Sequence, residues 1–161
     1  MKIFVAIVLF IVSVSQALSV ECARFFTHKG IPADALLDKQ NNLWVGLGFW
    51  NNVPGSVCLF DGKQCIYYDT NNTVMKRANV YSMALDPNNN LYINAGGNLC
   101  IYDGIKWTSI IATNDFIYNK KIEIDIYNNL WCCTTRDCCL VEYNGIRSVF
   151  YGDEKICQIL K

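Results

Sequence analysis

A stretch of sequence that occurs three times constrains this chain more than any other feature. Each copy contains an Asp, then two adjacent Asn residues, then a Leu-Trp or Leu-Tyr pair. The copies begin at Asp38, Asp86 and Asp125. Each copy is followed by an aromatic-Asp/Asn-Gly triplet, and the triplets start at Phe60, Tyr102 and Tyr143, which lie 42 and then 41 residues apart. A fixed period of this size is typical of a repeat architecture.

The pattern within each repeat predicts four short antiparallel strands. The first strand ends at the Asp, which forms a turn with the Asn pair, because Asp caps turns with its side chain and Asn tolerates positive φ. The second strand carries the Leu-Trp or Leu-Tyr pair. The third leads into the triplet, whose Asp-Gly or Asn-Gly is typical of a two-residue type I′ hairpin, and a fourth strand follows. The predicted repeats span about residues 33–68, 79–113 and 119–151, which matches the size of a β-propeller blade.

The residues of the first repeat also resemble a known family. They are Gly30-Ile31-Pro32, Asp38, Asn42-Leu43-Trp44-Val45-Gly46 and Phe60-Asp61-Gly62. They are similar to the two-component regulator propeller repeat, which runs Gly-Leu-Pro, Asp-x-x-Gly-Asn-Leu-Trp-Ile-Gly-Thr and Tyr-Asp-Gly, and the similarity covers most of residues 30–145. Asn replaces the turn Gly in all three copies, and only the first copy keeps a Gly after the Trp. The resemblance implies a blade-like fold and an extracellular sensing or scaffolding role.

We therefore expect an all-β fold of three four-stranded antiparallel propeller-like blades. A closed propeller typically has about four to eight blades. Three blades would stay open and be held by disulfides, or would close by dimerisation into a six-bladed ring, or would be the relic of a longer gene. An open array exposes apolar faces and strand edges, which is a liability for a soluble protein.

The first residues of the chain predict secretion. Residues 1–17 combine a positive start, an apolar core of about a dozen residues and small residues before a cleavage site after Ala17. The core is shorter than the roughly 20 residues of a membrane-spanning helix, so we expect a mature, extracellular chain of residues 18–161. The whole chain has 14 basic and 14 acidic residues, and the basic ones are dispersed. This distribution argues against a nucleic-acid or membrane-surface partner.

All nine cysteines lie after the signal peptide, and in a secreted protein they predict disulfides first. An odd number leaves at least one thiol free or paired between chains. If Asp61-Gly62 is a two-residue loop, and if a second hairpin turns at residues 134–137, opposed cysteines can pair. The predicted pairs are Cys58 with Cys65, Cys133 with Cys138 and Cys132 with Cys139. The sequence does not assign partners to Cys22, Cys100 and Cys157. A four-thiolate zinc site is the alternative, but structural zinc favours Cys-x-x-Cys spacing, so we expect no metal.

No group of residues predicts catalysis or a cofactor. His28 is the only histidine. Glu123 and Asp125 share a strand face and could serve as the carboxylate pair of a glycosidase, but Asp125 is also the turn Asp of the third repeat. The sequence from Asp86 is similar to a calcium loop, yet it lacks the glycine and the bidentate glutamate of that loop.

The first repeat carries an aromatic insertion that predicts a binding site. Leu43 and Phe60 are 17 residues apart, against 11 and 13 in the other repeats. Such insertions often lie on a binding face, and this one shares an end of the fold with the inter-blade loops. The predicted ligand contacts are Phe49, Trp50, Asn51, Asn52 and Arg136, with Trp50 first among them. The alternative is that the aromatic pair packs against a neighbouring blade. Asn71 lies in the only glycosylation sequon.

Together these features predict a secreted, non-enzymatic binding module with no cofactor. Its partner would be an unknown protein or glycan, and a homodimer is possible. The alternatives are a structural secreted protein cross-linked through its odd cysteine, and an extracellular propeller-type lyase or glycosidase.

Overall fold

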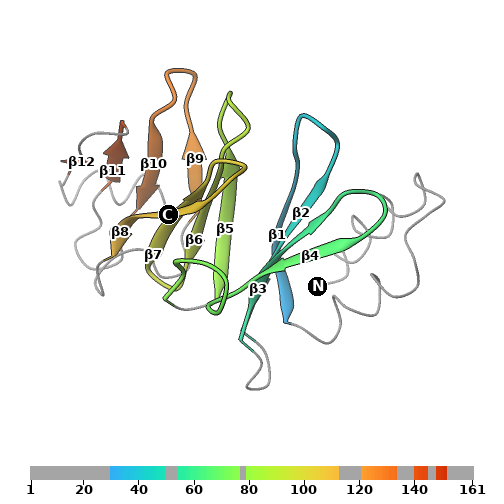
Figure 1. Ribbon diagram of the computed structural model, residues 1–161. Coiled ribbons are helices and arrows are strands. Elements are labelled where there is room, and N and C mark those ends of the chain that lie inside the picture. The colour runs from blue at the N-terminus through green and yellow to red at the C-terminus, as the bar shows by residue number, and fades with distance from the viewer. Residues whose placement is uncertain are drawn as a thin grey trace.

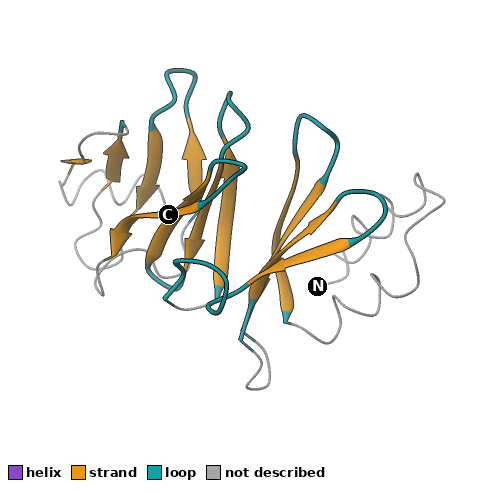
Figure 2. Cartoon of the chain, in the orientation of Figure 1, coloured by secondary structure: helices purple, strands orange, loops and turns teal. Residues whose placement is uncertain are grey.

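Three four-stranded antiparallel sheets make up the described part of the chain (Figures 1 and 2). The structure is a computed structural model that describes residues 30–49, 54–76, 79–112, 121–133, 140–144 and 148–151. Within these ranges every regular element is a strand, and no helix is long and apolar enough to cross a membrane. The sheets do not close into a ring, so the predicted all-β fold of open four-stranded sheets is confirmed.

Each sheet is built from consecutive strands. The first sheet contains β1 (Ile31–Leu37), β2 (Leu43–Gly48), β3 (Ser56–Phe60) and β4 (Cys65–Tyr68) in that order. The second contains β5 (Val80–Leu85), β6 (Leu91–Ala95), β7 (Asn98–Tyr102) and β8 (Trp107–Ala112). The third contains β9 (Ile122–Ile124), β10 (Leu130–Cys133), β11 (Leu140–Tyr143) and β12 (Ser148–Tyr151).

The turn after the first strand of each sheet is held by its Asp. Asp38 Oδ1 accepts the backbone N–H groups of Gln40 at 2.9 Å and Asn42 at 2.8 Å, while Oδ2 accepts the Asn42 amide at 2.9 Å. Asp86 and Asp125 make the corresponding bonds. The first Asn of each pair has positive φ, at 63°, 71° and 68° for Asn41, Asn89 and Asn128. These values explain why Asn can stand where the family pattern has Gly.

The triplet loops differ from the prediction. Phe60 pairs with Cys65, and Tyr102 pairs with Trp107, so each loop has four residues and not two. Asp61 Oδ1 accepts the N–H groups of Lys63 and Gln64, both at 2.8 Å. The predicted type I′ turn requires positive φ at both central residues, but only the Gly of each of these triplets has it. The Asp side chain therefore organises a wider loop.

The three sheets stack so that their first strands are neighbours. β5 contacts β1 on one side and β9 on the other, and the remaining strands of each sheet fan outward (Figure 1). Residues that alternate along a strand point to opposite faces, so the second sheet contributes to two cores. Its contacts with the first sheet form the first junction, and its contacts with the third sheet form the second junction.

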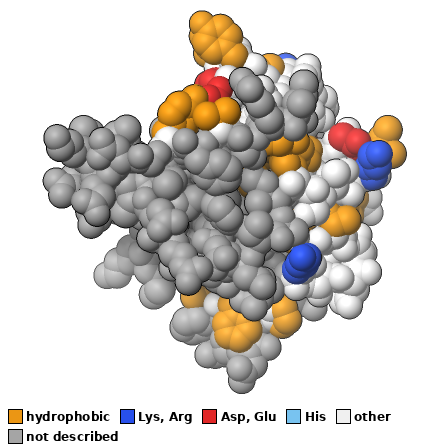
Figure 3. All heavy atoms as spheres, turned by 90° about the vertical axis from the view of Figure 1, so that its left-hand side faces the viewer, with side chains coloured by type: hydrophobic (Ala, Val, Ile, Leu, Met, Phe, Trp, Pro, Cys, Tyr) orange, Lys and Arg blue, Asp and Glu red, His pale blue; other side chains and the backbone are white. Residues whose placement is uncertain are grey.

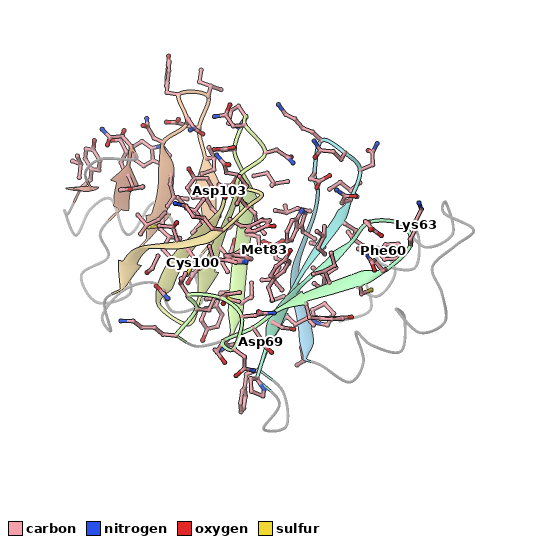
Figure 4. The ribbon with its side chains drawn as sticks, viewed as in Figure 1. Phe60, Lys63, Asp69, Met83, Cys100 and Asp103 are labelled. Carbon is pink, nitrogen blue, oxygen red and sulfur yellow. The ribbon has the colours of Figure 1, made fainter. Side chains whose placement is uncertain are left out.

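The first junction is the larger of the two. Its core contains Trp44, Val57, Met75, Val80, Met83, Leu91, Ile93, Ala95 and Cys100. Figure 4 shows Met83 between the first and second sheets. The second junction contains Ala84, Tyr92, Leu99, Ile122, Leu130 and Cys132.

The face of the first sheet that points away from the second sheet is also apolar. It is formed by Leu43, Val45, Leu47, Cys58 and Phe60, each 5% exposed or less. This face is thus already buried within a single chain. The predicted closure by dimerisation stays a prediction.

Candidate binding surfaces

The insertion in the first repeat begins at an exposed aromatic residue. Phe49 follows β2 directly and is 54% exposed. Its backbone N–H donates to Asn79 Oδ1 at 2.7 Å, and the Asn79 amide in turn donates to the Tyr81 hydroxyl at 2.8 Å. The start of the insertion is thereby fixed to the residue that precedes β5. This contact places the start of the β2–β3 connection beside the end of the β4–β5 connection, at the end of the sheets opposite the Asp turns, which is here called the loop end (Figure 1).

The other predicted ligand contacts cannot be placed. Trp50, Asn51, Asn52 and Arg136 lie outside the described residues, so their roles stay predictions. Of the predicted set, only the position and exposure of Phe49 are described.

The connection between β4 and β5 is an ordered part of the loop end. Thr73 Oγ1 donates to the Asp69 carbonyl at 2.6 Å, and it accepts the N–H of Met75 at 3.1 Å. Met75 is buried in the first junction, which anchors the connection to the core. Asn71 is exposed, so its sequon is accessible, and its glycosylation stays a prediction. Figure 4 shows Asp69 at this end and Lys63 at the β3–β4 loop.

A row of polar groups joins the three inner strands. Asp34 Oδ2 accepts the Met83 N–H at 2.8 Å and the Ser82 hydroxyl at 3.3 Å. Ser82 Oγ then accepts the N–H of Ile122 at 3.2 Å. The row satisfies backbone donors next to register shifts in β1 and β5, so it ties the sheets together. Asp34 and Ser82 each stand four residues before a turn Asp, so the repeat spacing places them at equivalent positions.

An aromatic cluster fills the outer part of the first junction. The rings of Trp44, Tyr68, Tyr102 and Trp107 pack with centroids between 5.0 and 5.9 Å apart. Burial, followed by the neighbouring Tyr102 hydroxyl, raises the pKa of Tyr68. Trp44, which stands at the recurring Trp/Tyr position of the repeat, therefore packs between the first and second sheets.

The third sheet repeats part of this arrangement on the face that points away from the second sheet. This face, which carries Trp131 and Tyr151, is here called the open face. Trp131 and Tyr151 stack with centroids 5.8 Å apart at 26°, close to the 5.9 Å and 23° of Trp44 and Tyr68. Trp131 Nε1 donates to Asp125 Oδ2 at 2.9 Å, as Trp44 Nε1 does to Asp38 at 3.2 Å. Tyr151 remains 40% exposed, whereas Tyr68 packs against the second sheet. The view in Figure 3 faces this side of the molecule, and hydrophobic and acidic side chains lie next to each other in its upper part.

The structure corrects two of the three predicted disulfides. Cys58 lies opposite Tyr67 and has a free thiol, so the Cys58–Cys65 bond is wrong. The four-residue loop causes this error, because it shifts the register by two residues from the predicted one. Cys65 is disulfide-bonded, but not to Cys58.

Cys132 forms no disulfide, so the predicted Cys132–Cys139 bond is wrong. The predicted Cys133–Cys138 bond involves side chains outside the described residues. Cys100 is free as well, and burial raises the pKa of its thiol to about 12 and that of Cys58 to about 11. Buried thiols with raised pKa values are poor nucleophiles and poor metal ligands.

The acidic residues of the described strands are engaged in structural bonds. Asp125 accepts four hydrogen bonds, led by that from Trp131 Nε1, and they lower its pKa. Glu123 forms an ion pair with Lys121. The two members of the possible glycosidase pair, Glu123 and Asp125, therefore each have a structural partner. Asp86 likewise binds the N–H groups of its own turn. Among the described residues no group of three His, Cys, Asp or Glu could hold a metal ion.

The sequence matches no protein-family model and no curated protein. Among solved structures, the chain is similar to one described as YCF48 bound to D1 peptide, with 11% identity and a TM-score of 0.49 over 76% of this chain and 41% of that one. It is also similar to the extracellular domain of the putative hybrid two component system BT4673 from B. thetaiotaomicron, with 15% identity and a TM-score of 0.39 over 77% of this chain and 21% of that one. The chain therefore spans less than half the length of either structure.

Proposed function

We propose that this chain is a secreted, non-enzymatic binding module that contacts a protein or glycan partner through its loop end. The observation that carries the proposal is Phe49, an aromatic side chain that is 54% exposed and whose backbone is fixed to Asn79. An exposed aromatic ring on a rigid support can stack on a sugar or become the anchor of a protein interface. Phe49 is the first residue of the insertion, and Trp50 follows it directly in the sequence.

The alternatives have less support. An enzyme needs convergent acids, bases or a metal, whereas Asp125 holds its turn and Glu123 pairs with Lys121. A cross-linked structural protein needs accessible thiols, but the sulfur-bearing side chains of Cys58, Cys100 and Cys132 are all buried. Secretion rests on residues 1–17, and N-terminal sequencing of the protein from culture medium should begin at Leu18.

Binding can be tested with an array of defined oligosaccharides and a displayed library of extracellular peptides. Wild-type protein, Phe49→Ala, Trp50→Ala and the control Ile105→Ala are compared on every ligand that the wild type binds. Ile105 is 90% exposed in the β7–β8 loop, so its change tests exposed apolar surface in general. We expect the two aromatic changes to weaken binding about ten-fold and the control to leave it unchanged. Equal binding by all four proteins would show that the loop end is not the site.

A further inference from the structure

The open face of the third sheet differs from its counterpart on the first sheet in one row of residues. In the first sheet, Trp44 lies opposite Leu36 on one side and Leu59 on the other. Directly opposed residues share a face, and this row packs against the second sheet. The corresponding row is therefore the part of a blade that meets the next blade.

In the third sheet the same row reads Glu123, Trp131 and Glu142. The two leucines of the first sheet are thus replaced by two carboxylates, while the aromatic residue between them is kept. Burying unpaired carboxylates against an apolar sheet is costly. This face is therefore not suited to an apolar blade, whether from a second copy of the chain or from another protein.

The aromatic stack and the carboxylates are instead complementary to a cation. Tyr151 lies two residues from Val149, which pairs with Glu142, so its ring is on the same face. The Tyr151 hydroxyl donates to Glu142 Oε2 at 2.6 Å, which fixes both side chains. A carboxylate has room for about four hydrogen bonds, so Glu142 can accept more from a ligand. Cations bind over aromatic faces, and arginine adds paired hydrogen bonds to carboxylates.

The chain already places one cation beside this row. The Lys121 ammonium pairs with Glu123, and the pair is well exposed, with side chains 75% and 60% accessible. The Glu123 carboxylate raises the pKa of Lys121 through this contact. Exposed ion pairs contribute little to stability, so an incoming guanidinium can displace Lys121 from Glu123.

We propose that the open face of the third sheet docks an arginine-bearing peptide segment of a partner protein. One guanidinium bonds to Glu142 beside the stacked rings of Trp131 and Tyr151, and a second basic group competes with Lys121 for Glu123. Charge complementarity selects this occupant over an apolar blade. The proposal concerns a surface separate from Phe49, and it does not depend on binding at the loop end.

The proposal is tested by fluorescence anisotropy with a short labelled Gly/Ser peptide that carries arginines. Its control replaces each arginine by citrulline, which keeps the shape and removes the charge. We expect the wild type to bind the arginine peptide about ten-fold more tightly than the citrulline peptide. Glu123→Gln with Glu142→Gln should remove that preference. Lys121→Gln should strengthen arginine binding, because it removes the internal competitor.

A charge-matched control separates this surface from general electrostatics. Thr70→Lys with Ile105→Lys changes the net charge by the same amount at exposed positions elsewhere, and it should leave the preference unchanged. Equal affinity for both peptides would overturn the proposal, as would an equal loss in the charge-matched control. A wild-type dimer in light scattering that Tyr151→Lys abolishes would also overturn it, because the occupant would then be a second copy. Circular dichroism verifies that every variant is folded.

Discussion

The two junctions of this molecule use the same repeat, yet they are joined in different ways. At the first junction, the Asp turn of the first sheet bonds to that of the second. The Lys39 N–H donates to Asn89 Oδ1 at 3.0 Å, and the Asn89 amide donates to Gln40 Oε1 at 2.7 Å. These bonds connect two turns that lie about fifty residues apart in the chain.

At the second junction the corresponding donor is missing. Pro87 holds the position of Lys39, one residue after the turn Asp, and proline has no N–H. Asn128 holds the position of Asn89, and its Oδ1 is buried without a hydrogen-bond partner. The turns fold in the same way, but the second turn lacks the backbone donor that links the first turn to its neighbour.

The aromatic packing is also less extensive at the second junction than at the first. Four rings pack at the first junction, whereas at the second the position of Trp44 is taken by Tyr92 and that of Leu36 by Ala84. Smaller side chains bury less apolar surface, and so contribute less free energy. We therefore expect the first junction to be the more stable of the two.

The largest expected effect comes from the recurring tryptophan. Trp44→Ala removes a side chain that is 4% exposed together with its bond to Asp38, and should cost about 3–5 kcal/mol in the free energy of unfolding. Trp131→Ala removes the same bond to the turn Asp on the open face. Because Trp131 is only half-buried, we expect about 1–2 kcal/mol. Unfolding in guanidinium chloride measures the loss of stability for both variants. Equal losses would contradict the expectation that the tryptophan stabilises a junction more than it stabilises an open face.

A glycine tests how closely the first and second sheets approach. A Cβ added at Gly46 would lie 2.5 Å from Val80 Cγ1, so Gly46→Ala forces the two sheets apart. The expected loss is about 1–3 kcal/mol. Gly48→Ala is the matched control on the same strand, since its nearest contact would be Asn79 Oδ1 at 3.3 Å. If both substitutions had the same effect, the loss would belong to the strand and not to the close approach.

Local patterns explain which parts of this fold the sequence could predict. The Asp-x-x-Asn-Asn turns were predictable because their bonds stay within five residues, as at Asp38. The triplet loops were not, because Asp-Gly is compatible with both a two-residue and a four-residue loop. The two-residue loop with positive φ at both positions is instead Gly96–Gly97, which connects β6 and β7.

The candidate binding surfaces were harder to predict because they depend on the register between strands. A shift of two residues moved Cys58 from Cys65 to Tyr67 and made the disulfide prediction wrong. The row of Glu123, Trp131 and Glu142 becomes visible only when cross-strand neighbours are known. The insertion that begins at Phe49 was predictable because it changes the length of a repeat, which the sequence shows directly.

A smaller effect tests the link between turns. Asn89→Gly keeps the positive φ but loses the two bonds to the first turn, and should cost about 1–2 kcal/mol. Asn128→Gly removes an oxygen that has no partner, and should change the free energy of unfolding by less than about 0.5 kcal/mol. Thermal unfolding of both variants gives the comparison. If Asn128→Gly cost as much as Asn89→Gly, the difference would not lie in the missing N–H of Pro87.

The smallest expected effect concerns two thiols at equivalent positions, two residues before their triplets. Burial raises the pKa of Cys100, in the first junction, to about 12, and that of Cys58, on the opposite face of the first sheet, to about 11, from an ordinary value of 9.0. Above pH 9 the unfolded chain releases these protons while the folded chain keeps them, so stability falls as pH rises toward the folded pKa. Cys100→Ala removes one such group, and its unfolding midpoint should decrease less steeply above pH 9 than that of the wild type. Identical slopes would mean that Cys100 is solvated in the folded chain, and that the first junction is looser than its packing indicates.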